Sequence, residues 1–447
     1  STFVVSLCSD HPPPSTFHWN LNMSRFLPAV ILLLACITTS TRLKAADADW
    51  SQFRGPAGNG ISSSTGLPTE WSAEKNIAWK TKLPGHGSSS PVLFGDQIFL
   101  TAYTGYGLTA EDEGNPADLR LHVIAVDRQN GQIMWDESVS PLNQVQKITK
   151  RIVDHGYATG TPACDKTGVY AFFGTSGVIA YDLKGKLKWR ADVGEGTAGF
   201  GSASSPILYK DFVIINASIE SSTVYALNKS NGEIAWKAEN IERAWTTPSI
   251  VDVPDGKQEL IVNQKNQILG LDPETGKQLW NCEGIQDYVV PVVVQNEGIL
   301  YCLGGRSNRS IAVRSGGRGD VTKTHKLWEV NVGANVTSPV YYNGHLYWAS
   351  DRGIAFCLDA KNGEVVYKNR LPTGARLYAS IILADGKFYI TTRDSGVIVL
   401  KAGPEYVELA QNKIDGEEDL FNASPAVSES SIFLRTDGYL YRITTKK

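Results

Sequence analysis

The chain has 447 residues, a formal net charge of −3, and hydrophobic side chains at 42% of its positions. This balanced charge lacks the basic excess that nucleic-acid-binding proteins usually show, so we expect no nucleic-acid partner. A chain of this length usually forms two or three domains, but a closed all-β repeat fold can hold as many residues in one.

The first 48 residues indicate processing segments rather than part of a fold. Residues 1–22 are expected to be an over-extended start or a disordered leader, and residues 23–48 a signal peptide. In the second segment Met23-Ser24-Arg25 precedes an apolar run over residues 26–37. Such a run is too short to span a bilayer stably and is typical of a secretory signal.

Two cleavage sites remain open for this signal. The small residues Ala46-Asp47-Ala48 suit ordinary cleavage, whereas Leu33-Leu34-Ala35-Cys36 is similar to a lipoprotein box, which would leave a lipid anchor at Cys36. Export follows from both alternatives, so a periplasmic or envelope-associated protein is expected. Only the second alternative attaches the chain to a membrane.

From residue 49 onward two short patterns recur in phase. One is a strand, a tight turn and a strand that ends in an aromatic residue, as in residues 271–280, where Gly276 suits a turn position with positive φ. The other is a Ser/Thr-Pro pair that opens a short apolar run. Its copies, two of them degenerate, are Ser90-Pro91, Thr161-Pro162, Ser205-Pro206, Thr247-Pro248, Val290-Pro291, Ser338-Pro339, Ser380-Ile381 and Ser424-Pro425.

The spacing of these pairs predicts the architecture. After a first interval of 71 residues the pairs recur every 42–48 residues, which is typical of propeller blades. Eight pairs therefore predict an all-β fold, an eight-bladed β-propeller of four-stranded antiparallel blades. In one blade the strands are expected at residues 338–342, 345–350, 354–358 and 364–369.

The two ends of the repeat region are expected to complete one blade together. Residues 76–80 resemble an outer strand without its inner partners, and residues 424–443 resemble three strands without a fourth. Such an N-/C-terminal clasp would close the ring and remove an open sheet edge. Residues 49–447 are thus expected to form one domain.

Tryptophan recurs on the outer strand of six repeats. One stacked cofactor would need a single tryptophan, so packing between blades is the better explanation of a repeated one. A small residue stands opposite and would leave room for the indole ring. These tryptophans are Trp79, Trp135, Trp189, Trp236, Trp280 and Trp328.

The pattern A-x-D-x-x-T-G-x-x-x-W resembles the pyrroloquinoline quinone-type repeat of quinoprotein alcohol dehydrogenases. It is also similar to the propeller lipoprotein of the outer-membrane barrel-assembly machine. The opening residues 50–56, with residues 67–71, resemble the start of many exported bacterial propellers of this superfamily. The resemblance covers residues 49–447 and implies the fold, but it implies little about function because the repeated residues are structural.

The resemblance also leaves a quinone-dependent dehydrogenase as a less favoured alternative. Such enzymes carry an adjacent Cys-Cys pair over the cofactor and a calcium ion held by acidic and amide side chains. Here no two cysteines are adjacent. Their spacing indicates neither a close pair nor a metal site and their neighbours are apolar strand residues, so buried free thiols are expected, with a disulfide left open. We predict no catalytic residue, no metal and no cofactor. The cysteines of the repeat region are Cys164, Cys282, Cys302 and Cys357.

Segments that depart from the repeat indicate which face of the propeller carries the binding surface. Residues 104–119 form an acidic insertion and residues 140–156 a basic one, and both are expected on the face that carries the turns between second and third strands. Aromatic and arginine side chains collect on the same face, which favours binding, although the aromatics could instead plug the channel. The candidate binding residues are Trp245, Tyr288, Tyr378, Arg306, Arg352, Arg393, His86 and His155.

We therefore expect an exported, monomeric, non-catalytic propeller. Its expected role is that of a protein-binding scaffold or assembly factor in the cell envelope, with a protein or peptide as the partner and a glycan as the alternative partner. A small-ligand or glycan-binding propeller is the alternative. The two hypotheses differ in whether the mouth of the central channel is open or plugged.

Overall fold

The computed structural model describes residues 49–109, 111, 113–372 and 376–445. The expected leader, signal peptide and lipid anchor at Cys36 lie outside these residues. All of the described residues belong to one compact unit. No helix in this part is long and apolar enough to cross a lipid bilayer.

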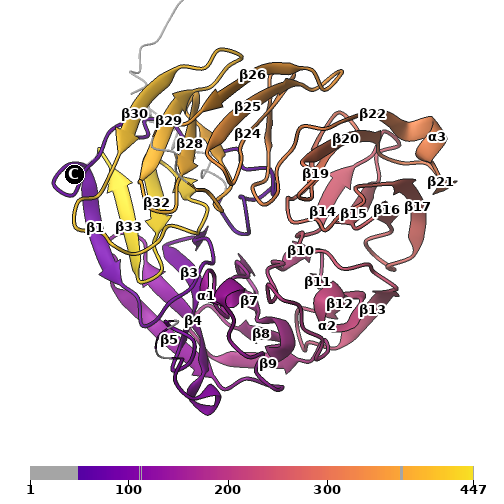
Figure 1. Cartoon of the computed structure of the whole chain (residues 1–447). Helices are drawn as coiled ribbons and strands as arrows, with labels where there is room; N and C mark the ends of the chain where they lie inside the picture. Colours follow the sequence, from indigo (N-terminus) through magenta and orange to yellow (C-terminus); the bar gives the residue numbers. More distant parts are fainter. Residues whose placement is uncertain (1–48, 110, 112, 373–375, 446–447) are drawn as a thin grey trace, which may run out of the picture. The chain divides into compact units, whose positions relative to one another are not determined.

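Eight sheets follow one another around a ring, so the fold is the predicted eight-bladed β-propeller (Figure 1). Blade 1 contains β2 (Val92–Phe94), β3 (Gln97–Thr104), β4 (Arg120–Asp127) and β5 (Ile133–Val139). Blade 2 contains β6 (Ala163–Asp165), β7 (Gly168–Phe172), β8 (Val178–Tyr181) and β9 (Leu187–Ala191). Blade 3 contains β10 (Ile207–Tyr209), β11 (Phe212–Ala217), β12 (Thr223–Asn228) and β13 (Ile234–Glu239).

The next four blades repeat this order from the inner to the outer strand. Blade 4 contains β14 (Ser249–Asp252), β15 (Gln258–Gln264), β16 (Gln267–Leu271) and β17 (Gln278–Glu283). Blade 5 contains β18 (Val294–Asn296), β19 (Ile299–Gly304), β20 (Arg309–Arg314) and β22 (Lys326–Val330). Blade 6 contains β23 (Val340–Tyr342), β24 (His345–Ala349), β25 (Ile354–Asp359) and β26 (Val365–Arg370). Blade 7 contains β27 (Ile382–Ala384), β28 (Lys387–Thr391), β29 (Val397–Lys401) and β30 (Glu408–Asn412).

Blade 8 combines strands from both ends of the described chain. It contains β31 (Ala426–Ser428), β32 (Ser431–Arg435), β33 (Tyr439–Thr444) and β1 (Ile77–Lys82). β1 pairs antiparallel with β33, and Lys80 lies opposite Tyr441. In Figure 1 the indigo β1 accordingly runs beside the yellow β33.

Helical segments in the described residues are single turns in the connections. They are η1 (Pro116–Asp118), α1 (Lys150–Val153), η2 (Gly174–Ser176), α2 (Ser218–Ser221) and α3 (Thr322–His325). The two insertions lie where the sequence predicts them. Residues 105–119 separate β3 from β4, the second and third strands of blade 1, and residues 140–162 connect blade 1 to blade 2.

The hydrophobic core lies between the blades. One cluster joins the facing sides of blades 2 and 3, with Tyr170 and Val178 against Val213 and Leu227. Similar clusters occupy the other blade interfaces. The inner strands are therefore buried on both faces, whereas an outer strand such as β1 alternates between half-buried and exposed residues. The four cysteines of the repeat region are free and buried, which confirms the prediction of buried thiols.

The outer-strand tryptophans pack against the next blade, as predicted. Trp189 lies opposite Ala180, and its Nε1 donates to the carbonyl of Lys229 in blade 3 at 2.9 Å. Gly232, with φ of 76°, seats the indole ring, because an added Cβ would lie 2.6 Å from it. Trp135, Trp236 and Trp328 donate to the next blade in the same way.

Blade 4 departs from the predicted four strands because an insertion from blade 5 extends it. β21 (Gly319–Asp320) adds a fifth, parallel strand beside β17, where Trp280 lies opposite Gly319. Trp280 is fully buried there, and its Nε1 donates to the Glu259 carboxylate of its own blade at 2.7 Å. The covered edge explains why this tryptophan bonds within its blade rather than to the next one.

Candidate functional site

The Ser/Thr-Pro pairs form a belt of hydrogen bonds around the inner strands. At six of the eight positions the serine or threonine that opens a blade donates its backbone N–H to the hydroxyl of the equivalent residue in the next blade, for example Thr161 to Ser205 at 3.1 Å. The remaining links of this kind are Ser90 to Thr161, Ser205 to Thr247, Ser338 to Ser380, Ser380 to Ser424 and Ser424 to Ser90. Val290 has no hydroxyl and interrupts the belt, and Ser338 accepts from Val292 instead.

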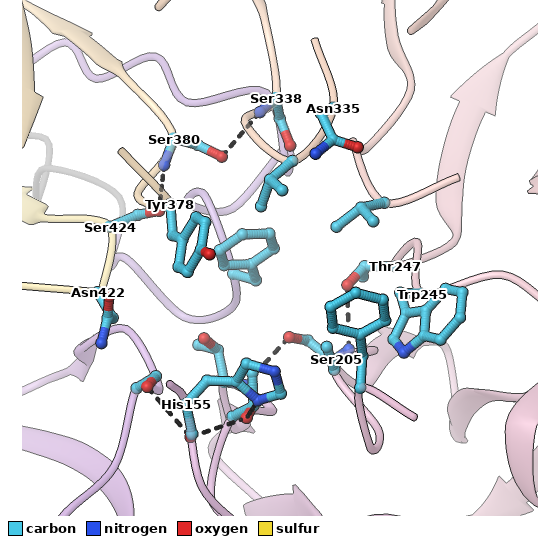
Figure 2. Close-up of a pocket in the computed structure, with 18 of the residues that line it drawn as sticks. His155, Ser205, Trp245, Thr247, Asn335, Ser338, Tyr378, Ser380, Asn422 and Ser424 are labelled. Atoms are coloured by element: carbon cyan, nitrogen blue, oxygen red, sulfur yellow. Dashed lines mark hydrogen bonds between the residues drawn. The ribbon is translucent and has the colours of Figure 1, made fainter. Parts of the chain in front are cut away.

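This belt surrounds a cavity of about 330 Å³. All eight belt positions line it, and so does a second ring of residues two positions earlier in each blade. Figure 2 shows part of both rings around the hollow, with Trp245, Tyr378 and Asn422 from the second ring. The second ring consists of Ser88, Thr159, Ala203, Trp245, Tyr288, Val336, Tyr378 and Asn422.

The segment 50–61, here called the strap, lies beyond the belt, on the side away from the second ring. Its carbonyls accept backbone hydrogen bonds of 2.8–2.9 Å from the inner strands of three blades, at Leu93, Cys164 and Leu383. Each of these residues follows its belt position, whereas the second ring precedes it. Because Phe53 of the strap also lines the cavity, the strap forms a floor and the cavity is a cup.

The Arg54 side chain links the strap to blade 6 through hydrogen bonds. The side chain is 1% exposed and donates to the carbonyls of Asn59, Ser338 and Pro339. Its burial lowers the pKa of the guanidinium to about 9. None of the described carboxylates lies within ion-pairing distance, so the charge is stabilised by peptide carbonyls alone.

Three aromatic side chains meet at one side of the cavity wall. The rings of Phe200 and Trp245 are 6.0 Å apart, and those of Trp245 and Tyr288 are 5.7 Å apart, both edge to face. The Trp245 indole is 8% exposed and donates to the carbonyl of Gly201 at 2.8 Å. Trp245 is therefore a fixed part of the wall, whereas Phe200 and Tyr288 are more exposed. We call these three residues the aromatic rim.

Polar side chains continue from the aromatic rim toward blade 6. The Tyr288 hydroxyl donates to Asn335 Oδ1 at 2.7 Å and accepts from Arg306 Nε at 3.2 Å. Asn335 Nδ2 in turn lies 3.4 Å from the carboxylate of Asp351. The predicted site residues Tyr288 and Arg306 are thus connected, and Arg306 is exposed at the mouth.

The opposite side of the cavity holds a second group. The Tyr378 ring lies over the guanidinium of Arg393 at 4.6 Å, and Arg393 forms an ion pair with Asp154 at 3.2 Å. Arg393 is 1% exposed and lies behind the lining rather than in it. Desolvation lowers the pKa of His155 to about 4, so this lining imidazole is neutral near pH 7.

Two predicted site residues do not join the others. Arg352 is exposed, and it is absent from the lining of the cavity. His86 pairs through its backbone with Tyr103, and its ring meets the edge of that tyrosine at 6.4 Å. The structure therefore places Trp245, Tyr288 and Tyr378 around one cavity, whose lining also includes His155 and Arg306. Arg393 packs behind this lining, against Tyr378. Arg352 and His86 lie outside the lining.

The insertions pack against each other beside this mouth. Tyr106 from the first and Tyr157 near the end of the second stack at 5.8 Å, and the Tyr106 hydroxyl accepts from the Ile148 N–H at 3.1 Å. They line a separate, open hollow of about 580 Å³, whose lining includes Glu113 and Lys147.

Sequence reasoning missed several lining residues. Phe53 stands in the strap, which occurs once, and Phe200 stands in a glycine-rich connection that no other blade shares. The belt hydroxyls carry a clear signal, the repeated Ser/Thr-Pro pair, but that pair by itself indicates only where a blade begins. Asn335, Asp351 and Asn422 have no signal that sets them apart.

The cavity does not fit the quinone cofactor that the superfamily implies. Its lining contains Arg306 together with the carboxylates of Asp154 and Asp351, so it offers no excess of positive charge to a polyanionic quinone. Within the described residues no group of three or more His, Cys, Asp or Glu side chains is placed to hold a metal ion. No two of the cysteines are adjacent in the sequence.

Comparisons with known proteins agree with the fold. The tetrathionate hydrolase of Acidithiobacillus ferrooxidans is 24% identical over 70% of this chain, and the chain spans 64% of that relative's length. The outer membrane protein assembly factor BamB of Yersinia pestis is 23% identical over 59% of this chain and 72% of its own length. The crystal structure of the quinohemoprotein alcohol dehydrogenase of Comamonas testosteroni aligns with a TM-score of 0.60 at 12% identity, over 89% of this chain and 80% of that one.

A family model extends these pairwise similarities to most of the propeller. The model described as outer membrane protein assembly factor BamB matches residues 119–321 and 317–403, which is more than half of the chain. Its matches run from blade 1 to blade 7 and include every second-ring aromatic residue. The chain belongs to the family of propellers described as outer membrane protein assembly factor BamB.

Proposed function

We propose that this chain is an exported, non-catalytic propeller that binds a protein partner in the cell envelope, as a scaffold or assembly factor. Membership of a family described as an outer membrane assembly factor supports this class of function. Two similar proteins are enzymes by name, a hydrolase and a dehydrogenase, so the non-catalytic character is part of the proposal.

The aromatic rim is the observation that indicates which surface binds the partner. Trp, Tyr and Arg are the residues that most often dominate binding energy at protein interfaces. Here Trp245, Tyr288 and Arg306 stand together at the mouth of a cup with a closed floor. An apolar side chain of the partner would enter the cup against Phe200 and Trp245, and Arg306 would hold a carboxylate or carbonyl oxygen.

Affinity capture from envelope extract tests the proposal. The purified protein should capture a partner that then binds in isolation, with a dissociation constant measurable by calorimetry. Tyr288→Ala and Arg306→Ala should each weaken that binding by about 1–4 kcal/mol, the range for anchor residues. A double Ala substitution of Lys277 and Gln278, exposed on the opposite face, is the matched control.

Two outcomes would contradict this function. One is a partner whose binding survives both Tyr288→Ala and Arg306→Ala but fails with the control, which would place the interface on the opposite face. The other is a wild-type protein that retains no partner which binds it in purified form.

A small-ligand or glycan-binding propeller is the second candidate. Two features favour it. The floor of the cup is closed, and its volume of about 330 Å³ falls within the size range of small-molecule pockets, about 300–1,000 Å³.

A further inference from the structure

We propose that the floor of the cup is a binding site for a neutral sugar ring. The site consists of the belt hydroxyls below, the lining carboxylates and amides at the sides, and the aromatic rim above. The inference concerns a ligand inside the cup and does not depend on a protein partner at its mouth.

The belt leaves a ring of hydrogen-bond donors unused. Seven belt residues carry a hydroxyl, each hydroxyl accepts one backbone N–H, and none of them donates to another described residue. All seven residues are at least 94% buried, and all line the cup. Buried donors require an acceptor, so these O–H groups are available to oxygen atoms inside the cup.

Acceptors for the hydroxyl groups of a ligand stand beside these donors. Asn422 Oδ1 is buried without a hydrogen-bond partner in the described structure, and Asn422 lines the cup. Asp154 and Asp351 line it as well. Their carboxylates each have one side-chain partner, Arg393 and Asn335, and keep lone pairs for further donors. A sugar both donates and accepts through each of its hydroxyl groups, whereas a fully ionised anion such as sulfate only accepts. The mixture of donors and acceptors therefore favours a sugar.

The charge of the lining and the arrangement of its donors also favour a neutral sugar. Asp154, Asp351 and Arg306 line the cup, and Arg393 behind the lining neutralises Asp154. The lining histidine is neutral, so no excess of positive charge favours a multiply charged anion. Hydroxyl groups radiate from all sides of a pyranose ring, which matches donors that arrive from seven blades. The apolar C–H face of such a ring can lie against Trp245 or Tyr288, as aromatic side chains in ligand pockets commonly allow.

Saturation-transfer NMR and calorimetry on the purified chain test the inference, with glucose, galactose and N-acetylglucosamine as probes and sulfate as the anionic comparison. At least one sugar should bind, and sulfate should not displace it. Thr161→Val and Thr247→Val keep the side-chain shape but remove the donor to the ligand, together with the acceptor of the N–H of Ser90 or Ser205. Each should weaken sugar binding about two- to tenfold, the factor expected for one hydrogen bond.

Two further variants separate binding from folding. Thr436→Val is the matched control, because the buried Thr436 hydroxyl also accepts a backbone N–H, from Tyr439 at 3.0 Å, but does not line the cup. It should leave sugar affinity unchanged. Val290→Thr adds a hydroxyl at the interrupted belt position and should tighten binding by a similar factor.

The inference is overturned if none of the sugars binds, or if sulfate binds in their place. It is also overturned if Thr161→Val and Thr247→Val, or Val290→Thr where those two variants do not fold, bind sugar with wild-type affinity. Because no partner protein is present, these outcomes leave the scaffold proposal untouched, and failure to capture a partner leaves the sugar measurement untouched.

Discussion

The backbone N–H of Ser424 donates a hydrogen bond of 3.1 Å to the hydroxyl of Ser90, which precedes it by 334 residues. This bond joins the inner strand of blade 8 to that of blade 1. It belongs to the same belt that links Thr161 to Ser205 and Ser380 to Ser424. The repeated Ser/Thr-Pro pair therefore connects neighbouring blades as well as opening each strand.

Replacing Ser90 by Ala should weaken this closure. The change leaves the Ser424 N–H without its acceptor in a buried position, which costs about 1–3 kcal/mol. Urea unfolding followed by tryptophan fluorescence measures the loss. Ser63→Ala, at an exposed serine of the N-terminal segment, should stay within about 0.5 kcal/mol of wild type. Equal stabilities of the two variants would contradict a structural role for the belt.

Trp280 should be the most costly of the outer-strand tryptophans to remove. Trp280→Ala deletes a fully buried side chain and should cost about 3–5 kcal/mol. Trp280→Phe keeps most of the volume but takes the indole donor from the buried Glu259 carboxylate, so we expect about 1–3 kcal/mol. Thermal and urea unfolding of both variants give the comparison. A loss below about 1 kcal/mol for Trp280→Ala would mean that the ring is not packed as described.

Gly232 and Gly256 offer a test of the seat for the indole ring at nearly equal backbone geometry. Their φ angles are 76° and 78°, but a Cβ on Gly232 would lie 2.6 Å from Trp189, whereas one on Gly256 would meet nothing within 4 Å. Gly256→Ala should therefore cost only the backbone strain, about 1–2 kcal/mol. Gly232→Ala adds the clash with the ring, about 1–3 kcal/mol more. Equal unfolding midpoints of the two variants would show that the Trp189 ring moves aside without cost.

The repeated residues explain why the blades were predictable from sequence. The belt serine or threonine, the turn glycine and the outer tryptophan each perform the same task in most blades, so their period reveals the fold. The expected inner-strand start at residue 338 and the observed β23, Val340–Tyr342, differ by only two residues. The fifth strand of blade 4 escaped prediction because β21 comes from an insertion with no counterpart in the repeat.

The site was predictable only where it follows the repeat. Trp245, Tyr288 and Tyr378 occupy one repeat position, so their place around one cavity follows from the propeller geometry. Turn residues carry no such register, because a turn side chain can point into the cup, behind its wall or into solvent. Arg393 turned inward to Asp154, whereas Arg352 remained exposed.

Glu220 should make stability depend on pH. Burial raises the pKa of this carboxyl group to about 7 from an ordinary value of 4.5, although Ser202 donates to it. Between pH 4.5 and 7 the unfolded chain releases this proton while the folded chain keeps it. The free energy of unfolding therefore falls as the pH rises through this window, by up to about 3 kcal/mol.

Glu220→Gln should remove this dependence. The variant should be more stable than wild type at pH 8 and similar to it at pH 5, as measured by melting temperatures at both pH values. Glu239→Gln, at an exposed position of β13, should follow the wild type at both. A variant without a gain at pH 8 would show that Glu220 is already ionised at little cost in the folded protein.

Arg54 should control whether the cup has a floor. Arg54→Ala removes a buried side chain and leaves the carbonyls of Asn59, Ser338 and Pro339 without their donors, so we expect a loss of at least about 3 kcal/mol. Arg54→Met keeps most of the volume and loses only the donors, so it should cost about 1–3 kcal/mol. Unfolding experiments rank the two variants, and the exposed Arg370→Ala serves as the control.

Hydrogen exchange then separates release of the strap from general destabilisation. The amides of Leu93, Cys164 and Leu383 donate to strap carbonyls, so their exchange should accelerate in Arg54→Ala. The amide of Thr161 donates within the belt and should keep its protection. If all four amides accelerate together, Arg54 stabilises the whole ring. If none does, the strap is held by Trp50 and its backbone bonds, and the floor of the cup does not depend on the arginine.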